Sequence, residues 1–251
     1  MVVVFSFDDG RDDAYIAFQI LKKYHLKGSF HITTGFVDGT FKTDDFGINR
    51  KPISIKQLKE MNESGMDISS HGDRHIMEKD DFRVSYEKLN KFGIRSKKVG
   101  FSVPNSNCSQ SETELFISYN KDILSYIRKG RSKKCYSFLS KMNYILYHLT
   151  HFQFFYNNFN KHNIMKKVCK FSLNSMVVLS DSKSKNIINF IKKYDNQNNI
   201  LILMFHSICD APSNKWEYSL VEFEKICSYV SFKQSCCSLK ELVEGIGANE
   251  Q

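Results

Sequence analysis

Two acidic side chains follow directly after the first apolar run of the chain. Residues 2–7 read Val-Val-Val-Phe-Ser-Phe, and Asp8 and Asp9 come next. Two adjacent carboxylates repel each other, so an arrangement that keeps both charged usually involves a cation. Because adjacent side chains diverge, one carboxylate can bind a metal while the other stays free as a base. The alternative is that the pair only caps a helix and begins its acidic first turn.

Three histidines also occupy places where side-chain chemistry is expected. His71 and His75 follow a short predicted strand at 66–69. If a helix begins at Ser69 or Ser70, the two imidazoles stand one turn apart, which is the spacing that two ligands of one metal need. An H-x-x-x-H pair alone can also be accidental.

His206 closes the most apolar run of the chain, at 201–205. Its alternative interpretation is a histidine at the edge of the core, satisfied by the backbone. Taken together, one carboxylate and two imidazoles make a three-ligand metal site with open positions. A spare carboxylate and a spare histidine could then serve as base and acid of a metal-assisted hydrolase.

Strand and helix patterns alternate along most of the chain. The predicted strands lie at 2–7, 29–32, 66–69, 99–103, 175–179, 200–205 and 235–238. The predicted helices lie at 12–28, 54–63, 81–92, 183–194, 220–230 and 239–243. This alternation indicates a parallel α/β sheet or barrel, whose active site lies at the carboxyl ends of the strands. The polar clusters all follow predicted strands.

Four short motifs occur in a fixed order. Residues 5–10 read F-S-F-D-D-G, and residues 70–75 contain H-x-x-x-H with Gly72 after the first histidine. Residues 101–104 read F-S-V-P, and residues 202–206 read I-L-M-F-H. This series resembles the polysaccharide deacetylases with NodB homology, the carbohydrate esterase family 4 type, in a divergent biosynthetic branch. The resemblance covers residues 2 to about 107 and 171–245.

The resemblance implies a fold, a cofactor and a ligand set. The fold would be an irregular (β/α) barrel, and we expect residues 1–251 to form a single catalytic domain. The cofactor would be a divalent metal, with zinc as the first choice and cobalt or nickel as alternatives. Its ligands would be Asp9, His71 and His75.

The resemblance also implies catalytic roles. Asp8 would be the general base that takes a proton from the attacking water, and His206 the acid that protonates the leaving amine. The backbone N–H of Asn105, next to Pro104, would bind the oxyanion. The expected reaction removes an acetyl or related acyl group from an amino sugar or a surface-polysaccharide precursor. The alternative is a weak or inactive barrel that binds carbohydrate or lipid-linked sugar.

Two positions depart from the family pattern. Ser102 stands where the family has an arginine that pairs with the base, so we expect the pKa of Asp8 to be higher than in the family's usual arrangement. The family's aspartate that orients the catalytic histidine has no clear match, and Asp181 is the nearest candidate. Trp216 follows His206 in the chain and cannot fill that place by motif order.

Residues 111–171 show no strand pattern and predict a helical insertion. Between residues 120 and 170 there are eleven Lys or Arg residues and one acid, and residues 136–159 carry nine aromatic side chains. The segment could pack on the barrel as an ordinary lid, or it could bind an anionic membrane surface or a lipid-linked sugar. Proteins that bind single-stranded nucleic acid also combine basic and aromatic side chains. No recognised nucleic-acid module is present, however, and we expect no nucleic-acid partner.

Composition sets the remaining expectations. The seven cysteines are scattered without a C-x-x-C, as is typical of free thiols in a reducing compartment. The first apolar run is too short for a signal peptide, and no run reaches the ~18 apolar residues of a membrane span. We therefore expect a cytoplasmic protein, with peripheral association at the inner membrane face left open. The sequence does not determine the oligomeric state.

Overall fold

The computed structural model describes residues 1–43, 50–106 and 108–247. Its centre is a parallel sheet in the order β5-β4-β3-β2-β1-β7-β6, with β10 paired to β1. The strands of this sheet are β1 (Val2–Phe7), β2 (Gly28–Ile32), β3 (Asp67–Ser70), β4 (Val99–Ser102), β5 (Leu124–Arg128), β6 (Met176–Val177), β7 (Ile200–Phe205) and β10 (Ser235–Cys236). Strands β8 (Ser207–Cys209) and β9 (Glu217–Ser219) form a separate parallel pair.

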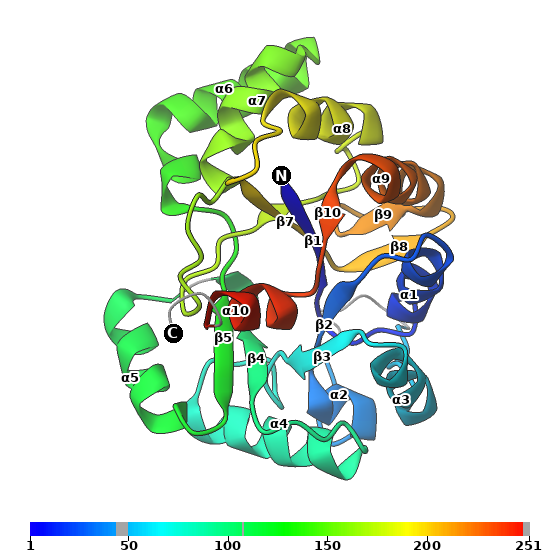
Figure 1. The fold of residues 1–251 in the computed structure, drawn as a ribbon, viewed down its shortest axis with the longest axis vertical. Helices are drawn as coiled ribbons and strands as arrows, with labels where there is room; N and C mark the ends of the chain where they lie inside the picture. Colours follow the sequence, from blue (N-terminus) through cyan, green and yellow to red (C-terminus); the bar gives the residue numbers. More distant parts are fainter. Residues whose placement is uncertain (44–49, 107, 248–251) are drawn as a thin grey trace.

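Helices surround the sheet (Figure 1). They are α1 (Ala14–Lys23), α2 (Thr34–Asp38), α3 (Ile55–Glu63), α4 (Lys79–Lys91), α5 (Gln110–Asn120), α6 (Phe138–Thr150), α7 (Gln153–Asn160), α8 (Ser184–Lys193), α9 (Leu220–Lys233) and α10 (Leu239–Gly247). Local sequence explains several of them. A capping box formed by Ser54 and Gln57 begins α3, within the helix predicted at 54–63. Helix α1 buries Ala14, Phe18 and Leu21 on one face.

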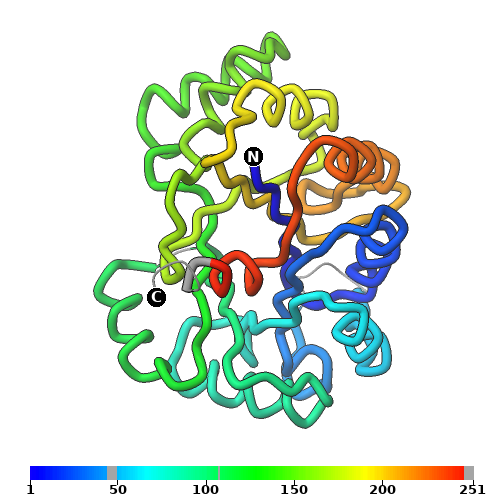
Figure 2. The backbone as a smooth tube through the Cα atoms, in the orientation of Figure 1, coloured from blue at the N-terminus to red at the C-terminus, as the bar shows by residue number. Residues whose placement is uncertain are grey.

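The sheet curls because its two edges meet through one segment of chain. Residues 170–175 run beside β5, where the backbone N–H of Ile127 donates to the Lys170 carbonyl at 2.8 Å. The chain then continues into β6, which pairs with β7. The backbone trace follows this curled path (Figure 2). The predicted parallel α/β barrel is confirmed.

Helix α10 lies against the amino ends of the strands. Its Leu239 belongs to a buried cluster with Val4, Tyr126 and Ile202 from three strands. The opposite ends of the strands, where Phe7, Ser70, Ser102 and Phe205 lie, therefore carry the loops that form the pocket.

The structure differs from the sequence predictions in residues 111–171. Helices α5, α6 and α7 fall in this segment, but so does β5, a strand of the central sheet. The run L-S-Y-I-R is short and mixes polar with apolar residues, so its period does not distinguish a strand from a helix. Within the described ranges, no helix is both long enough and apolar enough to cross a bilayer.

Candidate active site

The carboxyl ends of three strands bring the predicted residues into one pocket. Asp8 and Asp9 follow β1, His71 follows β3, and His206 follows β7. All four line the same pocket, and His75 lines it too. The wall also includes Asn105, Arg131, Tyr136 and Trp216.

Asp9, His71 and His75 present their ligand atoms to one another. His71 Nε2 lies 3.6 Å from Asp9 Oδ1 and 3.2 Å from His75 Nε2. One ligand atom from each residue lies within 4.8 Å of the others. Ligands at about 2.0–2.1 Å from a tetrahedral zinc ion are separated by about 3.3 Å. The spacing and the donor types therefore fit a divalent metal.

The hydrogen bonding of His71 fixes which ring nitrogen is free. Nδ1 lies 2.9 Å from the carbonyl oxygen of Ser102. A carbonyl can only accept, so Nδ1 carries the proton and Nε2 presents its lone pair toward Asp9. Burial lowers the pKa of His71 to about 3, against the opposing attraction of Asp8. The ring is therefore neutral near pH 7, as a metal ligand must be.

No helix forms directly after β3, contrary to the prediction. Gly72 and His75 have positive φ angles of 83° and 60°, and the loop is held from α4 instead. The buried Asp81 carboxylate accepts the backbone N–H groups of Asp73 at 2.7 Å and Arg74 at 3.1 Å. A Cβ at position 72 would lie 2.7 Å from Asp81 Oδ2, so only glycine fits there. The two imidazoles meet across a turn, not along one helix face.

Arg11 restrains the Asp9 carboxylate. Its Nε and Nη2 atoms donate to Asp9 Oδ2 at 3.0 and 2.6 Å, and both side chains are buried. Oδ1 is therefore the oxygen that faces His71. The motifs alone do not identify Arg11, although it directly follows the first motif at residues 5–10.

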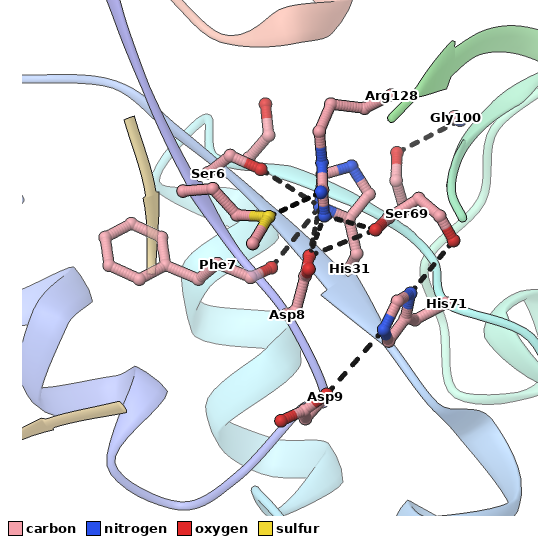
Figure 3. A network of polar contacts seen from close by, with 12 residues as sticks. Ser6, Phe7, Asp8, Asp9, His31, Ser69, His71, Gly100 and Arg128 are labelled. Atoms are coloured by element: carbon pink, nitrogen blue, oxygen red, sulfur yellow. Dashed lines mark hydrogen bonds and ion pairs between the residues drawn. The ribbon is translucent and has the colours of Figure 1, made fainter. Parts of the chain in front are cut away.

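A buried arginine from β5 pairs with Asp8. Arg128 is fully buried and donates to Asp8 Oδ1 (Figure 3). It also donates to Ser102 Oγ. Burial would raise the pKa of Asp8, but the charge of Arg128 is the largest opposing effect and the pKa lies well below its ordinary value. The cation that we expected to be missing beside Asp8 is therefore present, and the reason for expecting a higher pKa of Asp8 is wrong.

The position of Arg128 explains how the substitution at 102 is tolerated. Ser102 and Arg128 are register partners on β4 and β5. The small serine side chain leaves space that the arginine of the neighbouring strand enters. The cation expected at position 102 is thus supplied from position 128. The sequence does not predict this role, because residues 124–128 show no clear strand pattern and their only clue is a basic residue that ends a short run.

His31 lies beside Asp8 (Figure 3) and begins a buried polar chain. His31 Nδ1 lies 3.5 Å from Asp8 Oδ1 and 3.3 Å from the carbonyl oxygen of Phe7. On its other side, Nε2 lies 3.0 Å from the Tyr126 oxygen, and the Tyr126 hydroxyl donates to Asp67 at 2.6 Å. Because that hydroxyl proton goes to Asp67, His31 Nε2 must be the donor to Tyr126. His31, Tyr126 and Asp67 thus form a buried polar chain that begins at Asp8.

His206 lines the pocket without an orienting carboxylate. Its Nδ1 is buried and has no hydrogen-bond partner in the described part of the chain. Asp181 does not reach it, because the Asp181 carboxylate lies 3.4 Å from His148 Nε2. The indole of Trp216 packs against His206 instead, with ring centroids 4.6 Å apart. Burial lowers the pKa of His206.

Asn105 has the backbone geometry of a tight turn at the pocket wall. It follows the buried Pro104 and has φ 54° and ψ 7°. Its backbone N–H forms no hydrogen bond within the residues that the structure describes. This free donor beside the pocket suits the expected role, which stays a prediction.

Comparison with known proteins identifies a family that matches the first half of the chain. The sequence model of the polysaccharide deacetylase family matches residues 1–135. An uncharacterized protein of Dictyostelium discoideum is 29% identical over 160 residues, which are 64% of this chain and 51% of that protein. The chain thus spans about half the length of the curated relative it matches.

Solved structures share the fold at low identity. The family 4 acetyl xylan esterase of Clostridium thermocellum, solved with a cobalt ion, has a TM-score of 0.56 and 14% identity over 98% of this chain and 92% of that one. The peptidoglycan deacetylase PdaC of Bacillus subtilis has a TM-score of 0.51 and 12% identity over 99% and 94%. The family match covers more than half of the sequence, and its motif residues meet in one pocket. The chain belongs to the polysaccharide deacetylase family.

Proposed function

We propose that the chain is a metal-dependent hydrolase that removes an acetyl or related acyl group from an amino sugar or a surface-polysaccharide precursor. One observation carries the proposal: Asp8, Asp9, His71, His75 and His206 all line a single pocket. A carboxylate base, a metal-ligand set and an imidazole acid are together what hydrolysis of an amide requires. Membership of the family supports the same reaction.

Asp9, His71 and His75 would hold the metal, with zinc as the first choice and cobalt or nickel as alternatives. Such an ion polarises a carbonyl and makes water more acidic. The protein contributes the orientation of the ligands. Arg11 holds Oδ2 of Asp9, and the Ser102 carbonyl holds Nδ1 of His71, so the facing atoms are left for the ion.

Asp8 would act as the base. Within the described residues, Arg128, Ser102 and His31 all contact its Oδ1 atom. Oδ2 is thereby left to accept a proton from the attacking water. The lowered pKa keeps the carboxylate ionised near neutral pH, so it is ready to take that proton.

His206 would protonate the leaving amine, and the backbone N–H of Asn105 would donate to the oxyanion. Trp216 keeps the His206 ring in place by packing. Asp181 receives no catalytic role, because its contact is with His148.

One observation favours a second candidate function, a barrel that binds carbohydrate with little or no turnover. The Nδ1 atom of His206 has no partner in the described ranges, so its tautomer is not fixed as it is in most acid–base histidines. Aromatic rings of Tyr136 and Trp216 in the pocket wall suit sugar binding with or without catalysis.

Acetate release from acetylated amino sugars separates the two functions. The substrates should include free, nucleotide-linked, lipid-linked and polymeric forms. Asp8→Asn and His206→Ala should each lower turnover by about 10²–10⁴ while metal is retained. Asp12→Asn is the matched control, because Asp12 is exposed and lies in the same loop. Wild-type rates in either variant would remove that residue from the reaction. Carbohydrate binding without acetate release by the metal-loaded wild type would favour the second function.

A further inference from the structure

Exposed apolar side chains gather on the outer side of α6 and α7. Their exposed fractions run from 40% for Met142 to 79% for Phe138. We call this set the α6–α7 face: Phe138, Leu139, Met142, Ile145, Leu149, Phe152 and Phe154. A single large exposed hydrophobic residue needs no explanation, but seven within seventeen residues indicate a binding surface.

Helix α6 has an exposed apolar stripe in addition to the face that packs on the protein. Phe138, Met142, Ile145 and Leu149 are spaced by four, three and four residues, so they share one stripe. The opposite side is already packed, because Tyr147 is buried against the protein and its ring contacts Tyr156 at 5.1 Å. The outer stripe is therefore distinct from the face of α6 that packs against the rest of the protein.

The charge around this face has one sign. From residue 123 to residue 180 the sequence has ten Lys or Arg residues and no acid. Lys133, Lys134 and Lys141 are exposed, and none of the three forms an ion pair within the described residues. Lys141 lies three residues after Phe138 and four before Ile145, so it stands beside the apolar stripe.

The face projects from the barrel next to the pocket. Helices α6 and α7 lie at the end of the molecule, beyond α8 (Figure 1). Tyr136, two residues before Phe138, lines the pocket of Asp8 and His206, as does Arg131. A partner that covers the face would therefore lie close to the mouth of the pocket.

We propose that the α6–α7 face docks on an anionic phospholipid bilayer. Phenylalanine, leucine and methionine beside lysine suit the boundary between headgroups and acyl chains. Free lysines without acids match a negatively charged surface. Face-to-face pairing of two copies would bring the same unpaired lysines together, and that repulsion opposes a dimer. Docking of this kind does not require the pocket to be catalytic.

Vesicle co-sedimentation of the full chain tests this proposal. The vesicles are phosphatidylcholine alone and phosphatidylcholine mixed with phosphatidylglycerol, at low and at high salt. We expect binding to the mixed vesicles that falls about tenfold or more at high salt. Phe138→Ser/Leu149→Ser and, separately, Lys133→Glu/Lys134→Glu/Lys141→Glu should each lower binding about tenfold or more. These side chains are exposed, so folding should be retained, and circular dichroism checks it.

Phe232→Ser is the matched control. Phe232 on α9 is 80% exposed, but acids lie on the same helix at Glu222 and Glu224. It should bind vesicles as the wild type does. Equal binding to both vesicle types, or wild-type binding by Phe138→Ser/Leu149→Ser, would overturn the proposal. So would a wild-type dimer in sedimentation velocity that Phe138→Ser/Leu149→Ser converts to monomer, since a second copy would then occupy the face.

Discussion

At the scale of single residues, an arginine on β5 supplies the positive charge beside Asp8 that was expected from β4. Ser102 occupies the motif position, and Arg128 on the next strand supplies the guanidinium. The residues of the motifs themselves could be predicted from sequence, because each lies next to its neighbours in the chain. Arg128 could not, since it lies 120 residues from Asp8 and only the register of β4 and β5 brings it there.

Removal of Arg128 should reveal this pairing in the free energy of unfolding. Arg128→Met leaves a buried carboxylate without its cation, which costs about 3–5 kcal/mol. The same change in an Asp8→Asn background should cost much less, because no buried charge is then stranded. Urea unfolding of the wild type, the two single variants and the double variant gives the coupling energy between Arg128 and Asp8.

Arg83→Met is the matched control for this cycle. Arg83 pairs with Asp122 at 2.8 Å, but both side chains are exposed, so its loss should cost less than about 1 kcal/mol. Strictly additive costs for Arg128→Met and Asp8→Asn would show that the two groups do not interact.

At the scale of elements, the sequence predicts the strands and helices that are determined by neighbouring residues in the chain. The apolar runs of β1 and β7 and the capping box of α3 are short-range patterns, and all three are present. The turn after β3 has a cause that is not local, because Asp81 on α4 binds its backbone. A helix predicted from the spacing of two histidines cannot anticipate that contact.

The turn gives a prediction for metal affinity. Asp81→Ala should free the loop that carries His71 and His75, and so weaken metal binding by about 10–100-fold. Asp80→Ala is the control, because Asp80 is the exposed neighbour in the same first turn of α4. Isothermal titration with zinc or cobalt measures both. Equal affinity in the Asp81→Ala and Asp80→Ala variants would mean that the loop is held by other contacts.

At the scale of the whole molecule, buried charges couple distant segments and make stability depend on pH. Asp13 precedes α1 and accepts a hydrogen bond from Ser207 on β8. Arg50 lies 3.5 Å from Asp13 and also pairs with Glu217. Burial raises the pKa of Asp13 from 3.8 to about 6, despite the opposing hydrogen bond from Ser207. These contacts link the start of α1 to β8 and β9, far apart in the sequence, and no local pattern contains them.

The raised pKa of Asp13 fixes the sign of its pH effect. Between about pH 6 and pH 4 the folded chain binds a proton that the unfolded chain does not. Its contribution to the free energy of unfolding therefore grows as the pH falls through this window, by at most about 3 kcal/mol. Asp13→Asn should remove this contribution. Urea unfolding of both proteins from pH 7 to pH 4.5 measures the difference, and parallel curves would rule out the assigned titration.

Glu217 changes the free energy of unfolding with the opposite sign to Asp13 and in a lower pH range. The hydrogen bonds from Ser213 and the charge of Arg50 outweigh burial and lower the pKa of Glu217 to about 2. Its contribution is present above about pH 4.5 and is lost as the pH falls toward 2. The comparison of wild type with Asp13→Asn should therefore stay above pH 4.5, where Glu217 does not titrate.

The central claim is that Asp9, His71 and His75 form one metal site. Its most direct test is the number of zinc equivalents bound by chelator-stripped wild type, His71→Ala, His75→Ala and Asp8→Asn, measured by isothermal titration. We expect one equivalent for the wild type and for Asp8→Asn, and loss of stoichiometric binding in both histidine variants with the fold retained. Full stoichiometric binding by His71→Ala and His75→Ala would contradict it.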